Sequence, residues 1–182
     1  MTANIVITVL ILALVVFAAT RPSTYRVERS ATIPAPAGLV LPLLNDFHRW
    51  AAWSPWEGLD PAMKRTHSGA ASGVGAVYAW DGSKKAGMGR LEITESAPPA
   101  TITIQLDFLR PFESHNTTRF HLAAKRPATR LTWTMGGPSS FMTKPMGIFV
   151  SMDTMIGKDF ETGLAKLQRV GEQPGAAGLG GT

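Results

Sequence analysis

The polar and apolar residues of this chain follow two different periods. Between residues 25 and 136, several stretches alternate strictly between apolar and polar side chains. In TITIQLDF (101–108), for example, one face carries Ile102, Ile104, Leu106 and Phe108. Strict alternation is typical of strands that bury one face and leave the other in water. Six such stretches predict strands, with THSG (66–69) as a weaker candidate: 25–33, 75–82, 87–96, 101–108, 114–125 and 129–136.

A long helix is predicted after the strands, from about Ser140 to Arg169. At 100° per residue, one stripe of this segment carries Met142, Phe149, Met152, Ile156, Phe160, Leu164 and Leu167. Gly157 and Gly163 lower its helix propensity, and a close crossing with another element is the expected compensation. Two shorter helical segments are predicted between the first strand and the others, and residues 171–182 form a glycine-rich tail that we expect to be disordered.

The expected fold is therefore α+β. Strands that are wet on one side form a single curved antiparallel sheet of six or seven strands, and the amphipathic helix covers its apolar face. A curved sheet that wraps around a helix tends to enclose a pocket. This domain is expected to span residues 22–170.

The first twenty residues, MTANIVITVLILALVVFAAT, contain no charged side chain before Arg21. As a helix they would span about 30 Å, the thickness of a bilayer's hydrocarbon core. We therefore expect residues 1–21 to form a transmembrane anchor. A cleaved signal peptide is the alternative, although no basic residue precedes the apolar run. Arg21, Arg26 and Arg29 follow it, so the positive-inside rule places the domain in the cytoplasm, with an extracytoplasmic location as the alternative.

Composition narrows the possible chemistry. The absence of cysteine among the 182 residues excludes disulfides, thiolate nucleophiles and thiolate metal sites. The net charge of +5 is scattered along the chain, which argues against a nucleic-acid site. The four histidines have no metal-ligand spacing, and the glycines of SGVGAVY lead into a strand rather than a helix, unlike a dinucleotide-binding loop. No cofactor and no metal are expected.

Four segments carry a resemblance to a known family: RSATIPAPA (29–37), NDFHRWAAWSPWEGLDPAM (45–63), SGVGAVYAWDG (72–82) and SMDTMIGKDFETGLAKL (151–167). Together they resemble the polyketide cyclase/dehydrase-like branch of the START/Bet v 1 superfamily, the SRPBCC proteins. The resemblance implies a helix-grip fold, in which the sheet grips the C-terminal helix around an apolar cavity. Members bind lipids, sterols, aromatic polyketides or hormones, and a minority catalyse cyclisation or dehydration. No diagnostic catalytic motif is present, so no catalytic residue is assigned.

Aromatic and methionine side chains are the candidates for the cavity lining. Trp50 and Trp53 share one face of a short helix, and either plug the open end of the sheet or form a platform for a ligand. Methionine suits a surface that must accept variable apolar shapes, although it also fills gaps in irregular cores. The expected lining comprises Trp53, Trp56, Tyr78, Trp80, Ile104, Phe108, Phe120, Trp133, Met135, Phe149 and Met152.

Two charged residues interrupt the apolar pattern. Arg29 lies on the apolar face of the first strand, and Asp153 lies near the centre of the helical stripe. A lone buried charge is costly, so each needs a partner or water. One hypothesis makes them polar anchors for a ligand head group, another pairs them with each other, and a third places each at the edge of its element in contact with solvent. Asp46 and Glu57 are acid or base candidates that helix capping and exposure explain equally well.

These observations lead to one expected function and two alternatives. The expected function is membrane-tethered binding of a small hydrophobic ligand, such as a lipid, an isoprenoid or a polyketide-like molecule, in an internal cavity. The first alternative is a cyclase or dehydratase with Asp153 as its acid or base. The second is a stress-regulatory or protein-interaction module whose cavity is filled by its own side chains.

Overall fold

A computed structural model of the chain describes residues 24–97, 100–138 and 152–173. Along the chain the elements are β1 (Thr24–Ile33), α2 (Ala37–Asn45), the 3₁₀ helix η1 (Phe47–Ala52), β2 (Lys64–Gly69), β3 (Ala76–Asp81), β4 (Met88–Ala97), β5 (Thr101–Arg110), β6 (Ser114–Lys125), β7 (Ala128–Pro138) and α3 (Met152–Glu172). All the predicted strands are present, including the weak one around residue 67.

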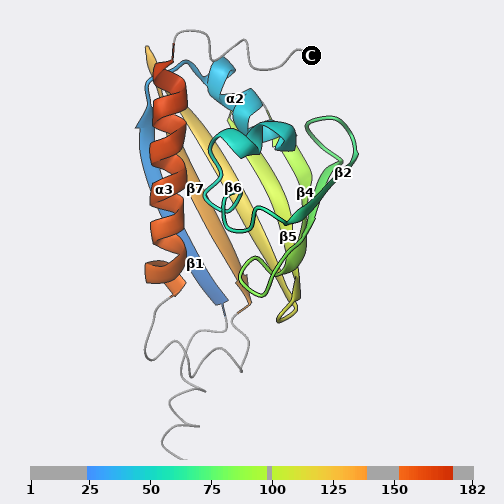
Figure 1. Cartoon of the computed structure of the whole chain (residues 1–182). Helices are drawn as coiled ribbons and strands as arrows, with labels where there is room; N and C mark the ends of the chain where they lie inside the picture. The colour runs from blue at the N-terminus through green and yellow to red at the C-terminus, as the bar shows by residue number, and fades with distance from the viewer. Residues whose placement is uncertain (1–23, 98–99, 139–151, 174–182) are drawn as a thin grey trace, which may run out of the picture.

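The seven strands form one antiparallel sheet in the order β1-β7-β6-β5-β4-β3-β2. Each strand from β2 to β7 pairs with its neighbour in sequence, whereas β1 pairs with the last strand, from Thr24 opposite Pro138 to Ile33 opposite Thr129. The sheet is curved, α3 lies along its concave side next to β1 and β7, and α2 and η1 cover one end of the same side (Figure 1). The predicted helix-grip arrangement is therefore confirmed.

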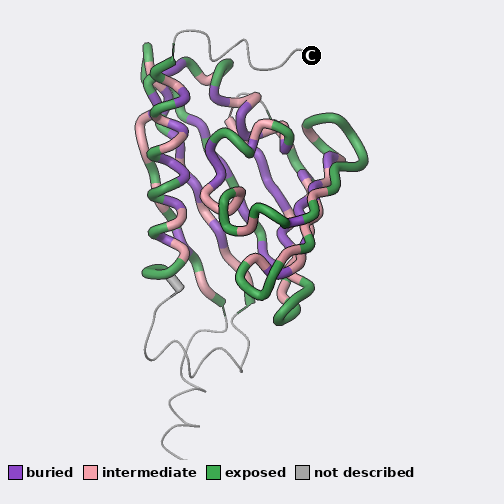
Figure 2. Tube along the Cα trace, in the orientation of Figure 1, coloured by how far each residue is buried: buried purple, intermediate pink, exposed green. Residues whose placement is uncertain are grey.

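Burial follows the alternation of the strands. In β6 the inward residues Asn116, Thr118, Phe120 and Leu122 are buried, while His115 and His121, at alternate positions, are exposed. Figure 2 shows the same alternation of buried and exposed positions along the strands. Both histidines therefore lie on the outer face of the sheet.

Two glycines of α3 allow the helix to approach the sheet closely. A Cβ atom on Gly163 would lie 2.9 Å from Cζ3 of Trp133 and 3.1 Å from Cδ of Pro55. At Gly157 the position of a Cβ atom is occupied by the guanidinium of Arg29. The predicted close crossing is confirmed, and it explains why two residues of low helix propensity occur in this helix. The helix ends at Glu172, and its predicted beginning at Ser140 lies outside the described residues.

The tryptophan-rich segment forms η1 because Asp46 caps it. The Asp46 Oδ1 atom accepts a hydrogen bond from the backbone N–H of His48 at 2.9 Å, which confirms the capping interpretation of this carboxylate. The helix ends at Ala52, so Trp56 lies beyond it.

The predicted membrane anchor, residues 1–21, lies outside the described residues. Within the part of the chain that the structure describes, no helix combines the length and the apolarity needed to cross a bilayer.

Candidate functional site

A cluster of five aromatic rings packs between α3, η1 and the sheet: Trp50, Trp53, Phe120, Trp133 and Phe160. Trp133 stacks on Phe160 with 3.9 Å between ring centroids, and Trp53 meets the edge of Trp133 at 5.5 Å. Trp53 and Trp133 are almost fully buried, at 0% and 1% exposure. This aromatic cluster occupies the space beneath η1 and the middle of α3, so Trp50 and Trp53 act as the plug that one of the sequence interpretations described.

The indole N–H groups of this cluster differ in whether they have a hydrogen-bond acceptor. Trp50 donates to the backbone carbonyl of Leu44 at 3.2 Å, and Trp53 donates to that of Leu43 at 2.8 Å. The Trp133 Nε1–H has no acceptor, and it is the one buried side-chain polar atom without a partner in the described residues. Buried polar groups in proteins are nearly always hydrogen-bonded, so a donor left without an acceptor requires an explanation.

The orientation of Trp133 shows which way this donor points. The Cζ3 atom of its ring faces Gly163 of α3. In an indole ring, Nε1 and Cζ3 lie on opposite edges, so the N–H points away from Gly163.

Next to Trp133 on the inner face, buried residues from four strands form a floor: Leu91, Leu106, Asn116, Thr118 and Met135. Half-buried aromatic residues lie around this floor on β1, β3, β5 and the segment after η1: Tyr25, Trp56, Trp80 and Phe108. We call these nine residues, together with the Trp133 N–H, the concave site.

The floor of the concave site combines apolar surface with fixed polar groups. The Tyr25 hydroxyl donates to Asn116 Oδ1 at 2.8 Å, and the Asn116 amide donates to the Ser114 hydroxyl at 3.1 Å. Burial raises the pKa of Tyr25 to about 12, so its hydroxyl stays protonated near neutral pH. Thr118 lies beside Met135 in the register and is 4% exposed. A few polar groups within an apolar surface are typical of small-molecule sites.

Glu57 organises a second polar group at the β2–β3 edge of the sheet. It accepts from the Tyr78 hydroxyl at 2.6 Å and from the Arg65 guanidinium at 2.7 Å. Burial, followed by the hydrogen bond to Glu57, raises the pKa of Tyr78. The Tyr78 phenol therefore stays protonated at neutral pH. The Glu57 carboxylate that accepts its hydrogen bond also forms an ion pair with Arg65.

Two stacked histidines join η1 to β2 beside this group. The rings of His48 and His67 lie 4.1 Å apart at an interplanar angle of 18°. Burial and the neighbouring His48 lower the pKa of His67. No group of three or more potential ligands with metal-site geometry occurs among the described residues.

Arg29 and Asp153 pair with each other, as one of the sequence hypotheses proposed. The Arg29 guanidinium donates to both Asp153 oxygens, at 2.8 Å and 2.9 Å, and to Glu161 at 2.8 Å. The side chains of Arg29 and Asp153 are 26% and 54% exposed. The hydrogen bond from Arg29 lowers the pKa of Asp153, so this carboxylate is ionised in an ion pair along α3.

The residues expected to line a cavity fall into three groups. Trp53, Tyr78, Ile104, Phe120, Trp133 and Met135 are buried on the inner side, and Trp56, Trp80 and Phe108 are half-buried. The side chains of Phe149 and Met152 lie outside the described residues. Sequence reasoning did not single out Tyr25, Asn116 and Thr118 as site residues. Their positions were detectable, because the alternation of their strands places all three on the inner face.

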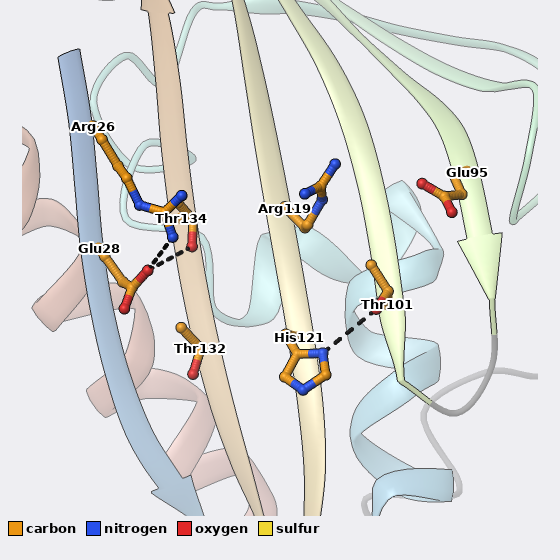
Figure 3. Close-up of a pocket in the computed structure, with 8 residues that line it drawn as sticks. All are labelled: Arg26, Glu28, Glu95, Thr101, Arg119, His121, Thr132 and Thr134. Carbon is orange, nitrogen blue, oxygen red and sulfur yellow. Dashed lines mark hydrogen bonds and ion pairs between the residues drawn. The ribbon is translucent and has the colours of Figure 1, made fainter.

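The convex side of the sheet carries a groove of about 570 Å³ lined by polar residues (Figure 3). Its charges are largely satisfied within the sheet: Arg26 pairs with Glu28 at 2.6 Å, and Thr103 links Arg119 to Glu95 through two hydrogen bonds. This groove is therefore unsuitable for an apolar ligand. The concave site, which combines apolar surface with fixed polar groups, is the candidate binding site.

The comparison with known families matches residues 24–172 to the model described as polyketide cyclase / dehydrase and lipid transport. No curated protein sequence matches the chain significantly.

Several solved structures share the fold at low sequence identity. Protein CV1439 from Chromobacterium violaceum is 16% identical with a TM-score of 0.58, and the match covers 85% of this chain and 100% of that one. DynU16, from the dynemicin biosynthetic locus, is 20% identical with a TM-score of 0.56 over 80% of this chain and 46% of DynU16. The di-domain ARO/CYC protein BexL, from the BE-7585A biosynthetic pathway, is 15% identical with a TM-score of 0.61 over 88% of this chain and 54% of BexL. The chain thus spans about half of DynU16 and about half of BexL, and these similarities establish the fold alone.

Proposed function

Because the chain belongs to the polyketide cyclase/dehydrase and lipid transport family, we propose that it binds a small apolar molecule at the concave site and that residues 1–21 hold it at a membrane. The ligand class is a lipid, an isoprenoid or a polyketide-like molecule. BexL, whose fold this chain shares, is a di-domain ARO/CYC protein of a biosynthetic pathway, which fits a ligand of the polyketide type.

The observation that carries this proposal is the unpartnered N–H of Trp133. A buried donor without an acceptor costs about 1–3 kcal/mol. A ligand whose carbonyl oxygen lies within hydrogen-bond distance of Nε1 would remove this cost on binding. The ligand is therefore an apolar molecule with at least one hydrogen-bond acceptor, and Asn116 and Thr118 add polar contacts that orient it.

Binding has more support than catalysis for a physical reason. Asp153, the first acid or base candidate, is held in an ion pair with Arg29. The Tyr78 phenol is held protonated against a carboxylate that Arg65 already neutralises. A general acid or base needs a pKa near the working pH, and these contacts move the pKa values of Asp153 and Tyr78 away from it.

The test is native mass spectrometry of the full chain extracted from its host membrane. We expect a co-purified small molecule, and we expect Trp133→Phe, which keeps a ring but removes the donor, to lower its retention. Trp50→Phe is the matched control, because it removes an indole N–H that already has a protein acceptor. A wild-type chain that carries no small molecule would contradict the proposal and favour the interaction module, for which the tightly packed aromatic cluster is the supporting feature. Equal retention by the two variants would contradict the role of Trp133.

The membrane attachment is tested separately by fractionation of the same host cells. We expect the full chain to remain in the membrane pellet after an alkaline wash, because an apolar helix of twenty residues is buried in lipid rather than adsorbed to its surface.

A further inference from the structure

The start of β1 and two of the turns between strands lie at the same end of the sheet. At this end β1 begins at Thr24 opposite Pro138, and the β3–β4 turn (82–87) and the β5–β6 turn (111–113) lie alongside, at the bottom of Figure 1. We call it the Thr24 end. The opposite end carries α2 and the β2–β3 turn (70–75).

The Thr24 end exposes large apolar side chains. Phe112 in the β5–β6 turn is 70% exposed, and Leu109 just before the turn is 48% exposed. Met155 in the first turn of α3 is 56% exposed. Single exposed apolar residues are common, but an exposed aromatic ring at the tip of a turn, with a second exposed apolar residue three positions before it, is typical of a surface that contacts another phase.

Charged residues accompany these apolar side chains: Glu113, next to Phe112, is exposed, and two lysines occur in the neighbouring turn. Lys84 and Lys85 are exposed in the β3–β4 turn, and neither forms an ion pair with any described residue. Lysines beside exposed apolar side chains are the combination that binds the surface of anionic lipids.

The short connection between the apolar run and β1 restricts which end of the domain can lie next to a bilayer. The apolar run ends at Thr20, and three residues, 21–23, separate it from Thr24. A fully extended chain would place Thr24 within roughly 14 Å of the end of this run. Ile33, at the far end of β1, lies roughly 30 Å further along the strand. An anchor formed by residues 1–21 would therefore hold the Thr24 end, and not the α2 end, next to the bilayer.

We propose that the Thr24 end of the domain docks on an anionic lipid bilayer through the exposed residues of its β3–β4 and β5–β6 turns. This inference rests on the proposed function in one respect, since it uses residues 1–21 as the anchor. It also gives the concave site an orientation. Tyr25, Trp80 and Phe108, three of its half-buried aromatic residues, lie towards the same end of their strands, so this part of the concave site would be the part nearest the bilayer.

The absence of cysteine makes a direct test possible, because any cysteine introduced is a unique labelling site. Full-length Phe112→Cys and Val74→Cys chains are labelled with an environment-sensitive dye and reconstituted into vesicles of phosphatidylcholine and phosphatidylglycerol. Val74 is the matched control, since it is apolar, 57% exposed and placed in the β2–β3 turn at the opposite end. We expect a blue-shifted emission and quenching by brominated lipid at position 112, and neither at position 74.

A second variant tests the charge contribution. Lys84→Glu with Lys85→Glu, added to the Phe112→Cys chain, should reduce the lipid quenching and the blue shift, as should added salt, because screening weakens the attraction to anionic lipid. Unchanged quenching in this variant would remove the lysines from the docking surface.

Three outcomes would overturn the docking proposal: a water-like emission at both positions, equal quenching at both positions, or quenching at position 74 alone. Loss of the chain from the vesicles would overturn it together with the membrane anchor. Native mass spectrometry of the same labelled chains keeps ligand binding separate, because a chain that retains a small molecule and fails to dock contradicts only the docking.

Discussion

Trp53 and Trp133 are two equally buried tryptophans in contact with each other, and they differ in what their N–H groups meet. Trp53 belongs to the side of the core formed by α2 and η1, where its donor reaches the Leu43 carbonyl. Trp133 belongs to the side formed by β7 and α3, where its ring stacks on Phe160 and its donor meets no acceptor.

The two sides of the core therefore differ in how far their indole donors contribute to the fold. On the Trp53 side every indole donor is used to hold α2 against η1, so this side contributes its full hydrogen bonding to the fold. On the Trp133 side the packing contributes to stability, but the indole N–H has no acceptor in the described residues, and under the proposed function a ligand would supply one. A protein selected only for stability would gain by removing such a donor.

Truncation of Trp53 should give the largest effect. Trp53→Ala removes a fully buried ring that contacts Trp50, Phe120 and Trp133, and we expect the free energy of unfolding to fall by about 3–5 kcal/mol. Urea denaturation followed by tryptophan fluorescence measures it. Leu59→Ala, at a side chain 49% exposed, should change stability by about 0.5 kcal/mol or less. If Trp53→Ala lowered the free energy of unfolding no more than Leu59→Ala does, the structural role of the α2 and η1 side would be contradicted.

A pair of conservative variants compares the two donors directly. Trp53→Phe leaves the Leu43 carbonyl without its donor, whereas Trp133→Phe removes a donor that has no partner. The two ring truncations are matched, so we expect Trp53→Phe to be less stable than Trp133→Phe by about 1–3 kcal/mol in ligand-free protein. Equal stabilities would mean that the Trp133 donor does find an acceptor.

The contact between α3 and the Trp133 ring can be altered from the helix. Gly163→Ala would place a Cβ atom 2.9 Å from Trp133 Cζ3, so either the ring or the helix must shift. We expect a net loss of about 1 kcal/mol, because overpacking outweighs the gain in helix propensity. Gly38→Ala in α2 is the control, because no atom lies within 4 Å of its Cβ position, and it should be neutral or stabilising. A stabilised Gly163→Ala variant would show that α3 lies further from the sheet.

The two sides of the core should also lose stability at different pH values on acidification. This is the smallest of the expected effects. The pKa of His67, next to η1, is lowered by burial and by His48, so its contribution is present above pH ~6.5 and is lost as the pH falls from there towards the folded-state pKa. The pKa of Asp153 on α3 is lowered by Arg29, so its contribution persists until the pH falls below ~3.9 and through the folded-state pKa. Hydrogen exchange should therefore show η1 opening at a higher pH than the first turns of α3. His67→Gln should remove the η1 response, and loss of protection in the reverse order would contradict the assignment.

The sequence was most informative about strand faces, because strand periodicity is a local property. The alternation in SHNTTRFHLAAK placed His115 and His121 outside and Phe120 and Leu122 inside, as the structure has them. The same alternation contained Asn116 and Thr118 as inward polar residues. It carried no information about their partners, since Tyr25 bonds to Asn116 from a strand 91 residues away.

The candidate site itself was only partly predictable. Trp56, Trp80 and Phe108 followed from composition and face, whereas Tyr25 was missed. Nine of the eleven expected lining residues lie on the inner side within the described part of the chain. The division between rings that fill the core and residues that border the concave site was not predictable, because it depends on where η1 and α3 pack across the sheet.

The sequence by itself determined the order of elements, the inward face of each strand, the apolar stripe of α3 and the positions where glycine permits close packing. Each of these follows from periodicity or from side-chain size within a few consecutive residues. The tertiary structure alone decided that Arg29 meets Asp153 across 124 residues, and that Trp53 has an acceptor while Trp133 has none. Hydrogen bonds act over about 3 Å, so these partners exist only once distant segments have been brought together by folding.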